Sequence, residues 1–189
     1  MNFTNDAGIK IVQNLVTSIQ ENKEYLSRID GEIGDGDHGI NMNKGFTIAG
    51  EEISKQDLNM SGALLLLSKV LMTKIGGSMG PLYGTIFKAM GEASQEAEVI
   101  DIGIVGDMLR NALEGIRRIS PAQVWDKTLM DVLVPAVEAF EAAKRSGDEL
   151  DVSLVQMQQA AEMGKESTKD LVAKIGRSSR LGERSRGVL

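Results

Sequence analysis

The stretch "GALLLLSKVLMTKI" (residues 62–75) decides the fold class, because it is apolar on nearly every face that a helix would present. A helix that is hydrophobic all round lies in the interior, where other elements cover each of its sides. Ser61 precedes the stretch as a predicted N-cap, and the glycine-rich segment "GGSMGP" (76–81) follows it. We therefore expect residues 61–75 to form the most buried helix of the protein.

The segments around this stretch show the 3.6-residue period of amphipathic helices. Asn5 is the predicted N-cap of the first helix, whose apolar stripe includes Val12, Val16 and Ile19. No segment alternates apolar and polar residues for long enough to predict a strand, and the aromatic residues that favour strands make up only 4%. The predicted helices span residues 5–29, 38–53, 61–75, 81–97, 104–119, 127–145 and 152–175.

These helices and the short segments between them predict an all-α fold. We expect an antiparallel up-and-down helical barrel or bundle that forms a single domain over residues 1–189. Pro135 should kink the sixth helix, and the tail "GRSSRLGERSRGVL" (176–189) has no apolar period. Because seven is an odd count for a closed up-and-down arrangement, an eighth helix is expected to be missing from the chain.

Composition excludes several classes of function. The chain has no cysteine, so a disulfide, a thiolate zinc site and a cysteine nucleophile are all excluded. A net charge of −6 argues against binding to nucleic acid or to anionic membranes. The N-terminus lacks a signal peptide, and the longest apolar run, "ALLLL", is too short to span a bilayer. We expect a cytoplasmic protein that holds any phosphate ligand locally.

The segment "DGEIGDGDHGINMN" (30–43) is the candidate site with the most specific pattern. Asp30, Asp35 and Asp37 are separated by three glycines, which allow the backbone to fold tightly enough for the carboxylates to converge. Converging carboxylates repel one another unless a cation neutralises them. The calcium EF-hand pattern fails, because Gly39 stands at its third acidic position. Three aspartates in an open loop suit magnesium with phosphate oxygens and water.

The helix predicted from His38 adds a phosphate-binding feature to this loop. Its first turn offers unpaired backbone N–H groups and the positive end of the helix dipole, and His38 and Asn41 add side-chain donors. The structural alternative is that Asp-Gly pairs form ordinary turns and that Asp37 is only an N-cap. Residues 30–43 alone leave both interpretations open.

Two further segments are weaker candidates for phosphate binding. In "KIGGSMGPLYGT" (74–85), glycine amides and the hydroxyls of Ser78 or Thr85 could contact phosphate, but the segment matches neither the P-loop nor the Rossmann fingerprint. Taken by itself, the segment is better explained as a tight turn between two helices. The tail gathers four arginines, which either clamp phosphates or form a solvated segment. They are Arg177, Arg180, Arg184 and Arg186.

Taken together, these three segments resemble the nucleotide-binding L subunit of dihydroxyacetone kinase in order and spacing. "DKTLMDVLVPAVEAF" (126–140) is similar to the sixth helix of that family, including its proline. The resemblance implies an eight-helix antiparallel barrel with resident ADP or ATP bound at one end through two magnesium ions. The family continues beyond "GERSRG" with a further turn and a last helix, whereas this chain stops at Leu189.

The resemblance also implies roles for individual residues. Asp30, Asp35 and Asp37 would hold the metal ions and act as the catalytic residues. Two positions depart from the family: Trp125 and Ser120 stand where glycines are usual. A third departure is Ser78-Met79, where the family usually has Ala-Ser. The implied nucleotide-binding residues are His38, Gly39, Ile40, Asn41, Ser78, Met79, Ser120, Leu129 and Arg177.

The implied function is that of the phosphotransferase-system-dependent kinase. A phosphoprotein subunit would phosphorylate bound ADP, and the γ-phosphoryl group would then pass to dihydroxyacetone on a substrate-binding subunit, giving dihydroxyacetone phosphate. The main alternative is a non-catalytic, Mg-ADP-loaded subunit that acts as co-regulator of a transcription factor. In a third interpretation His38 is a phosphocarrier, which the neighbouring aspartates oppose because they would repel an incoming phosphoryl group.

Overall fold

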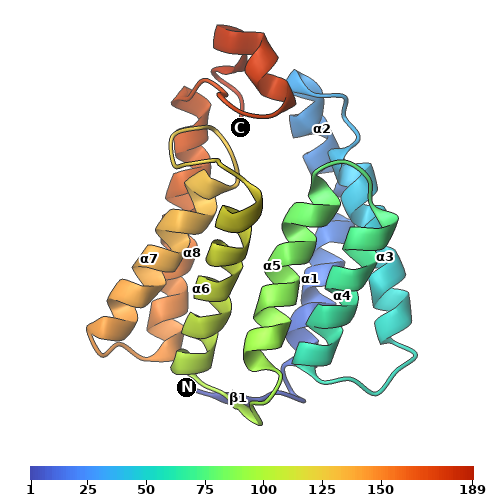
Figure 1. Cartoon of the computed structure of the whole chain (residues 1–189), viewed down its shortest axis with the longest axis vertical. Helices are drawn as coiled ribbons and strands as arrows, with labels where there is room; N and C mark the ends of the chain where they lie inside the picture. The colour runs from blue at the N-terminus through green and yellow to red at the C-terminus, as the bar shows by residue number, and fades with distance from the viewer.

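A computed structural model describes residues 1–189 and confirms the all-α fold (Figure 1). Two strands of two residues form the single antiparallel pair, with Phe3 opposite Ile100. The α-helices are α1 (Ile9–Glu21), α2 (Lys23–Ile33), α3 (His38–Ile53), α4 (Met60–Lys74), α5 (Met79–Ser94), α6 (Ile102–Ile119), α7 (Met130–Arg145) and α8 (Leu150–Ser167). The remaining elements are β1 (Phe3–Thr4), β2 (Val99–Ile100) and the 3-10 segments η1 (Thr168–Asp170) and η2 (Arg177–Ser185).

Helix α4 lies at the centre of the larger core, as its apolar sequence predicts. Leu64, Leu67 and Leu71 are almost completely buried, and α1, α3 and α5 pack around the helix. The N-cap is Asn59, whose side chain accepts a hydrogen bond from Gly62 N; Ser61, predicted as the cap, lies inside the helix. Asn59 takes this role because its backbone is extended there, as an N-cap requires.

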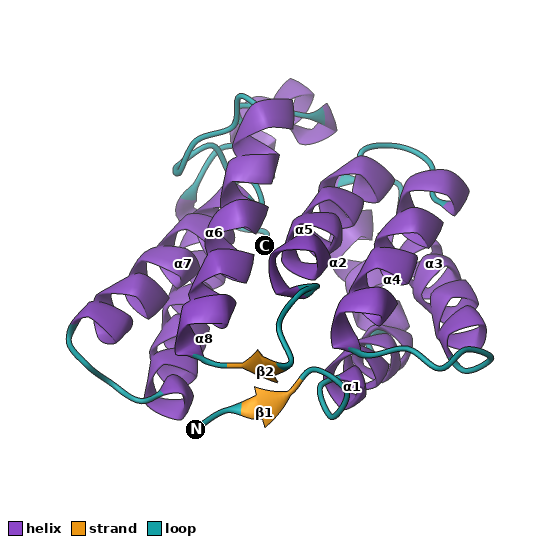
Figure 2. Cartoon of the chain, turned by 60° about the horizontal axis from the view of Figure 1, so that its bottom comes forward, coloured by secondary structure: helices purple, strands orange, loops and turns teal.

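The helices form two groups that α5 and α6 join (Figure 2). One group surrounds α4, and the other consists of α6, α7 and α8, with a smaller core that includes Leu113, Ile116 and Val137. Neither α1 nor α2 packs extensively against α8. At one end of the molecule the C-terminal tail runs from α8 towards α2, and η2 contacts α2 (Figure 1). None of the helices combines the length and apolar composition that crossing a bilayer requires.

The prediction of one helix over residues 5–29 is wrong, because the chain breaks at Asn22 into α1 and α2. The Asn22 side chain donates to Ser18 O at 2.8 Å, a local bond of the kind that competes with a continuing helix. Asn5 caps no helix. It is buried, and its Nδ2 donates to Ser61 Oγ at 2.9 Å and to Ser94 O at 3.0 Å, which ties the N-terminus to α4 and α5.

This break gives eight α-helices, so the expected count of seven is also wrong. At the other end of the chain, α8 stops at Ser167, whereas the sequence predicted a helix to residue 175. The tail, which has no apolar period and in which no helix was predicted, folds into η2. Its 3-10 turns bury few apolar side chains, which explains why hydrophobic periodicity did not reveal it.

Candidate metal and phosphate site

The three aspartates of residues 30–37 converge at the end of α2 and the start of α3. One carboxylate oxygen from each of Asp30, Asp35 and Asp37 lies within 4.8 Å of the others. Gly36 has a φ of +74°, a left-handed conformation that favours glycine, and it turns the loop back towards α2. The carboxylates converge as the sequence predicted, but of the three glycines only Gly36 makes a left-handed turn, since Gly31 lies within α2.

The oxygen atoms of this cluster fit a divalent cation. Asp37 Oδ2 accepts a hydrogen bond from Asn41 Nδ2 at 2.9 Å, but Asp37 Oδ1 is buried and has no partner in the protein. A buried carboxylate oxygen without a partner is costly, and a cation would remove that cost. Arg177 Nη1 donates to Asp35 Oδ2 at 2.5 Å, and this hydrogen bond lowers the pKa of Asp35 although partial burial opposes it.

The first turn of α3 divides into residues that face the site and residues that do not. Burial lowers the pKa of His38, while Asp30 and Asp37 act in the opposite direction. The His38 ring lies edge-on to Tyr83, with 6.4 Å between the ring centroids. Gly39 is buried against α2, and Ile40 is 54% exposed to solvent. Asn41 therefore lies at the site through its bond to Asp37, and Gly39 has a packing role. His38 contacts the aspartates through its backbone N, 3.4 Å from Asp30 Oδ2, while the residue lines a separate pocket with Asp30, Tyr83 and Leu129.

Gly39 lies at a close approach between α2 and α3. A Cβ atom at this position would lie 2.0 Å from Lys23 O and 2.8 Å from Ser27 N. Both contacts are with backbone atoms, which cannot move aside as a flexible side chain can. Only glycine at this position therefore allows α3 to pack this tightly against α2.

A cavity of about 690 Å³ adjoins the aspartates. Its walls come from the start of α3, the loop before α5 and the start of η2, so segments far apart in the sequence meet there. The expected residues Asn41, Ser78, Met79 and Arg177 all face it, whereas Arg180 is an addition that the sequence did not single out. The lining residues are Asp37, Asn41, Gly76, Gly77, Ser78, Met79, Gly176, Arg177 and Arg180.

An apolar pocket of about 570 Å³ continues from this cavity, and Ser78 and Gly176 line both. Ser120 and Leu129, two of the residues expected to bind the nucleotide, line the apolar pocket. The sequence did not identify its other apolar walls, because they come from α5, α6 and the tail and meet only in the folded chain. These walls include Pro81, Leu82, Ile116, Ile119, Ala122 and Ile175.

The segment between α6 and α7 forms one wall of the pocket and is held by a buried carboxylate. Asp131 is 2% exposed and accepts hydrogen bonds from Trp125 N at 2.5 Å and Thr128 N at 2.7 Å. Trp125 and Lys127 both have left-handed backbones, with φ values of 76° and 60°. Lys127 Nζ donates to Thr168 O and to the tail at Val188 O, both at 2.5 Å, and burial lowers the pKa of Lys127.

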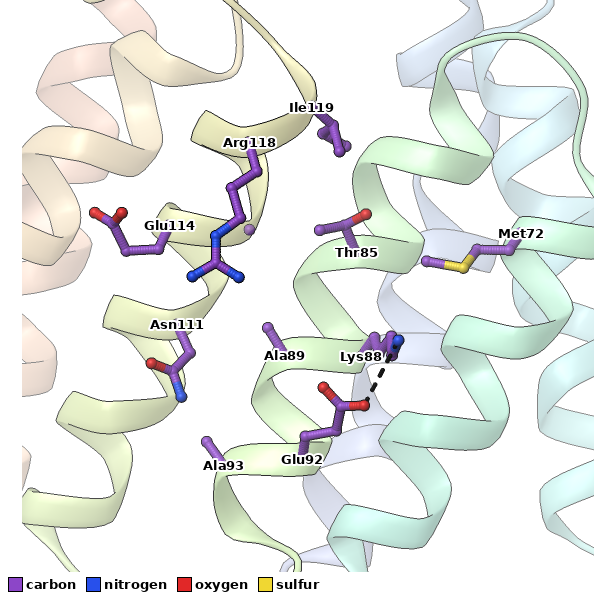
Figure 3. A pocket seen from close by; sticks show the side chains of 11 residues that line it. Met72, Thr85, Lys88, Ala89, Glu92, Ala93, Asn111, Glu114, Arg118 and Ile119 are labelled. Carbon is purple, nitrogen blue, oxygen red and sulfur yellow. Dashed lines mark ion pairs between the residues drawn. The ribbon is translucent and has the colours of Figure 1, made fainter.

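A second groove, of about 510 Å³, lies between α5 and α6 (Figure 3). It shares Met72, Thr85 and Ile119 with the apolar pocket, but none of the three aspartates lines it. Two of its acidic groups are already paired, since Glu92 lies 3.6 Å from Lys88 and the Glu114 carboxylate accepts from Arg117 at 2.8 Å. The candidate chemistry therefore lies at the aspartate end of the molecule.

Comparison with known proteins agrees with this geometry. Residues 32–189 match the family model of the DAK2 domain. The chain belongs to the DAK2 domain family. This DAK2 chain is 34% identical over 190 residues to the "PEP-dependent dihydroxyacetone kinase 1, ADP-binding subunit DhaL" of Listeria innocua, covering 100% of this chain and 90% of that protein. It is 36% identical over 165 residues to the corresponding ADP-binding subunit of Escherichia coli, covering 87% and 79%.

Solved structures support the same fold for the DAK2 chain. The native dihydroxyacetone kinase of C. freundii is similar with a TM-score of 0.72 at 23% identity, over 94% of this chain and 31% of that longer chain. Its complex with AMP-PNP and Mg2+ is similar with a TM-score of 0.68 at 20% identity, over 98% and 32%. At these identities the likeness shows the fold, and the chain spans about a third of that kinase. The resemblance inferred from the sequence is confirmed at the level of the family.

Proposed function

We propose that this chain is the ADP-binding subunit of a phosphoenolpyruvate-dependent dihydroxyacetone kinase that works in the cytoplasm. The observation that carries the proposal is the convergence of Asp30, Asp35 and Asp37 beside a cavity with glycine amides and arginines on its other walls. The unpartnered oxygen of Asp37 supports a cation there. Relatives at 34% and 36% identity are described as ADP-binding subunits of such kinases.

Each group of residues has a distinct task in this proposal. The three aspartates would hold two Mg2+ ions, which supply the charge neutralisation that phosphoryl transfer needs. The N-terminus of α3, with His38 and Asn41, donates hydrogen bonds to phosphate, as do Ser78 and the amides around Met79. Ser120 and Leu129 place the adenine in the apolar pocket. Gly39 and Ile40 would contribute to phosphate binding through their backbone alone, as part of the first turn of α3.

The proposed reaction sequence keeps the nucleotide in place. A phosphoprotein subunit of the phosphotransferase system transfers its phosphoryl group to resident ADP, and ATP then transfers the γ-phosphoryl group to dihydroxyacetone on a second subunit. The P–O bond to ADP breaks, a P–O bond to the substrate hydroxyl forms, and the hydroxyl proton leaves to a base outside this chain. This chain needs only to position the reacting groups and to stabilise their charge, because phosphoryl transfer needs little covalent catalysis by the protein.

Two linked measurements test the proposal. The purified protein is denatured, and released ADP and magnesium are quantified; we expect about one ADP and about two Mg2+ per chain. The protein is then mixed with the two partner subunits, phosphoenolpyruvate and dihydroxyacetone, and dihydroxyacetone phosphate is measured. Bound nucleotide without product would favour the co-regulator alternative. A protein that neither contains nor takes up Mg-ADP would contradict both functions.

A further inference from the structure

The four arginines of the tail differ in what they contact. Arg177 is bound to Asp35, and Arg186 donates to Glu183 and to the backbone carbonyl of Asp170. Arg180 and Arg184 are exposed, and neither forms a hydrogen bond or an ion pair within the protein. Of these two, only Arg180 lines the cavity beside the aspartates.

The geometry of η2 explains why Arg180 faces the cavity and Arg184 does not. Side chains three residues apart in a 3-10 helix lie directly above one another, so Arg177 and Arg180 share one side of η2. Gly176, with a φ of 76°, turns the chain into this segment. Arg184 lies four positions after Arg180 and so falls on a different side of a 3-10 helix, and Gly182 interrupts the helical backbone between them with φ 53° and ψ −130°.

The charges around the cavity leave Arg180 without a counter-ion. The carboxylate of Asp35 occupies Arg177, so Arg180 is the arginine on the cavity wall whose guanidinium is free to bind an anion. A guanidinium offers five N–H donors in a planar fork that matches phosphate oxygens. Opposite it, Gly76 and Gly77 leave open space where side chains would otherwise project.

We propose that Arg180 binds the terminal phosphoryl group of the nucleotide, and that it distinguishes the triphosphate from ADP. The inference rests on the proposed function. Arg177 lies at the aspartates, whereas Arg180 is one 3-10 turn, about 6 Å, further along the tail. Its exposed position suits a group that partner subunits must reach from outside. The guanidinium stays protonated while the P–O bonds are exchanged, so it binds the moving group and takes no part in bond making.

Equilibrium binding separates this role from general nucleotide binding. Titration calorimetry with Mg2+ compares ADP and AMP-PNP on the wild-type chain and on Arg180→Gln, Arg180→Lys and Arg184→Gln. Arg180→Gln should weaken AMP-PNP binding by about tenfold or more and change ADP binding by less than about twofold, because a charge-assisted hydrogen bond is lost only with the triphosphate. Arg180→Lys should recover part of the loss, and Arg184→Gln, which removes the same charge from the same tail, should bind both nucleotides normally.

Three outcomes would overturn the inference. Equal weakening of ADP and AMP-PNP in Arg180→Gln would make the residue a general electrostatic contributor, and unchanged binding of both would mean that it does not touch the nucleotide. The same loss in Arg184→Gln would show an effect of net charge alone. In all three cases the wild-type chain still binds Mg-ADP, so the proposed function survives. If the wild-type chain binds neither nucleotide, the proposed function itself fails. The Arg180 side chain is exposed and forms no hydrogen bond or ion pair within the protein, so thermal unfolding of the variants should match the wild type.

Discussion

Arg177 Nη1 donates a 2.5 Å hydrogen bond to Asp35 Oδ2 and so joins the tail to the aspartate loop across 142 positions of sequence. Lys127 anchors the same tail from another side through Val188 O. The tail therefore forms one wall of the cavity beside the aspartates, although it contributes few apolar contacts of its own. The tail is attached to the rest of the protein by a few polar contacts, and each contact can be tested by substituting one side chain.

Arg177→Gln should loosen the tail without unfolding the protein. Both partners of the pair are substantially exposed, so the pair adds little to global stability and is weakened by salt. Amide hydrogen exchange of residues 177–185 should become faster, while exchange in α4 stays unchanged. Arg110→Gln is the matched control, because it removes an exposed, ion-paired arginine from α6. Equal exchange in the tail of both variants would contradict the tether.

Asp37→Asn should separate metal binding from fold stability. Without metal, the variant should be as stable as the wild type or more stable, because it removes one of three mutually repelling carboxylates. Its magnesium-dependent affinity for ADP should fall by at least about tenfold, since a direct ligand is lost. Thermal unfolding with EDTA and with Mg-ADP measures both effects, and the exposed Asp57→Asn is the control. An Asp37→Asn protein with full Mg-ADP stabilisation would exclude Asp37 as a ligand.

The features predicted from the sequence are those that short segments encode. Three aspartates spaced by glycines, and an apolar helix at residues 61–75, carry their signal within a few turns of chain. Asn5 was misread because its partners, Ser61 and Ser94, lie 56 and 89 positions away. The sequence did not distinguish Arg180 from the other three arginines of the tail for the same reason. Only the fold shows that Arg177 is already hydrogen-bonded to Asp35. Long-range polar pairing leaves no periodic pattern for a sequence to display.

Gly39→Ala should destabilise the protein although alanine is the better helix former. Its Cβ would meet Lys23 O at 2.0 Å, which forces α3 away from α2. We expect a loss of about 2 kcal/mol in the free energy of unfolding, within the range for overpacking of a rigid contact. Gly76→Ala is the control, since no atom lies within 4 Å of its Cβ position and its effect should stay within about 0.5 kcal/mol. Urea unfolding measures both, and equal stability of the two variants would contradict the close approach of α2 and α3.

Protonation of Asp126 at low pH should loosen the segment between α6 and α7, because the Asp126 carboxylate holds it in place. The hydrogen bond from Gln123 N, and then the pairing with Lys174, lower the pKa of Asp126, while desolvation opposes them. Because the pKa is lower in the folded state, the ionised group stabilises the segment above the usual carboxyl range. This contribution is lost as the pH falls through the lowered pKa. Trp125 is the only tryptophan in the chain and adjoins Asp126, so its fluorescence reports the change. Asp126→Asn should remove this acid transition; if it persists in the variant, Asp126 is not its origin.

Trp125→Gly should stabilise the protein even though it removes a large side chain. Trp125 has a φ of 76° and is 61% exposed, so it pays for a left-handed backbone and gains little from packing. Glycine removes this strain, and the greater entropy of the unfolded chain offsets part of the benefit, which leaves a net gain of about 1 kcal/mol. Trp125→Ala separates the two effects, because it removes the indole and keeps the Cβ that causes the strain. Urea unfolding of the three proteins should show the gain in Trp125→Gly alone, and an equal gain in Trp125→Ala would mean that the exposed indole, and not the backbone, is the source of the cost.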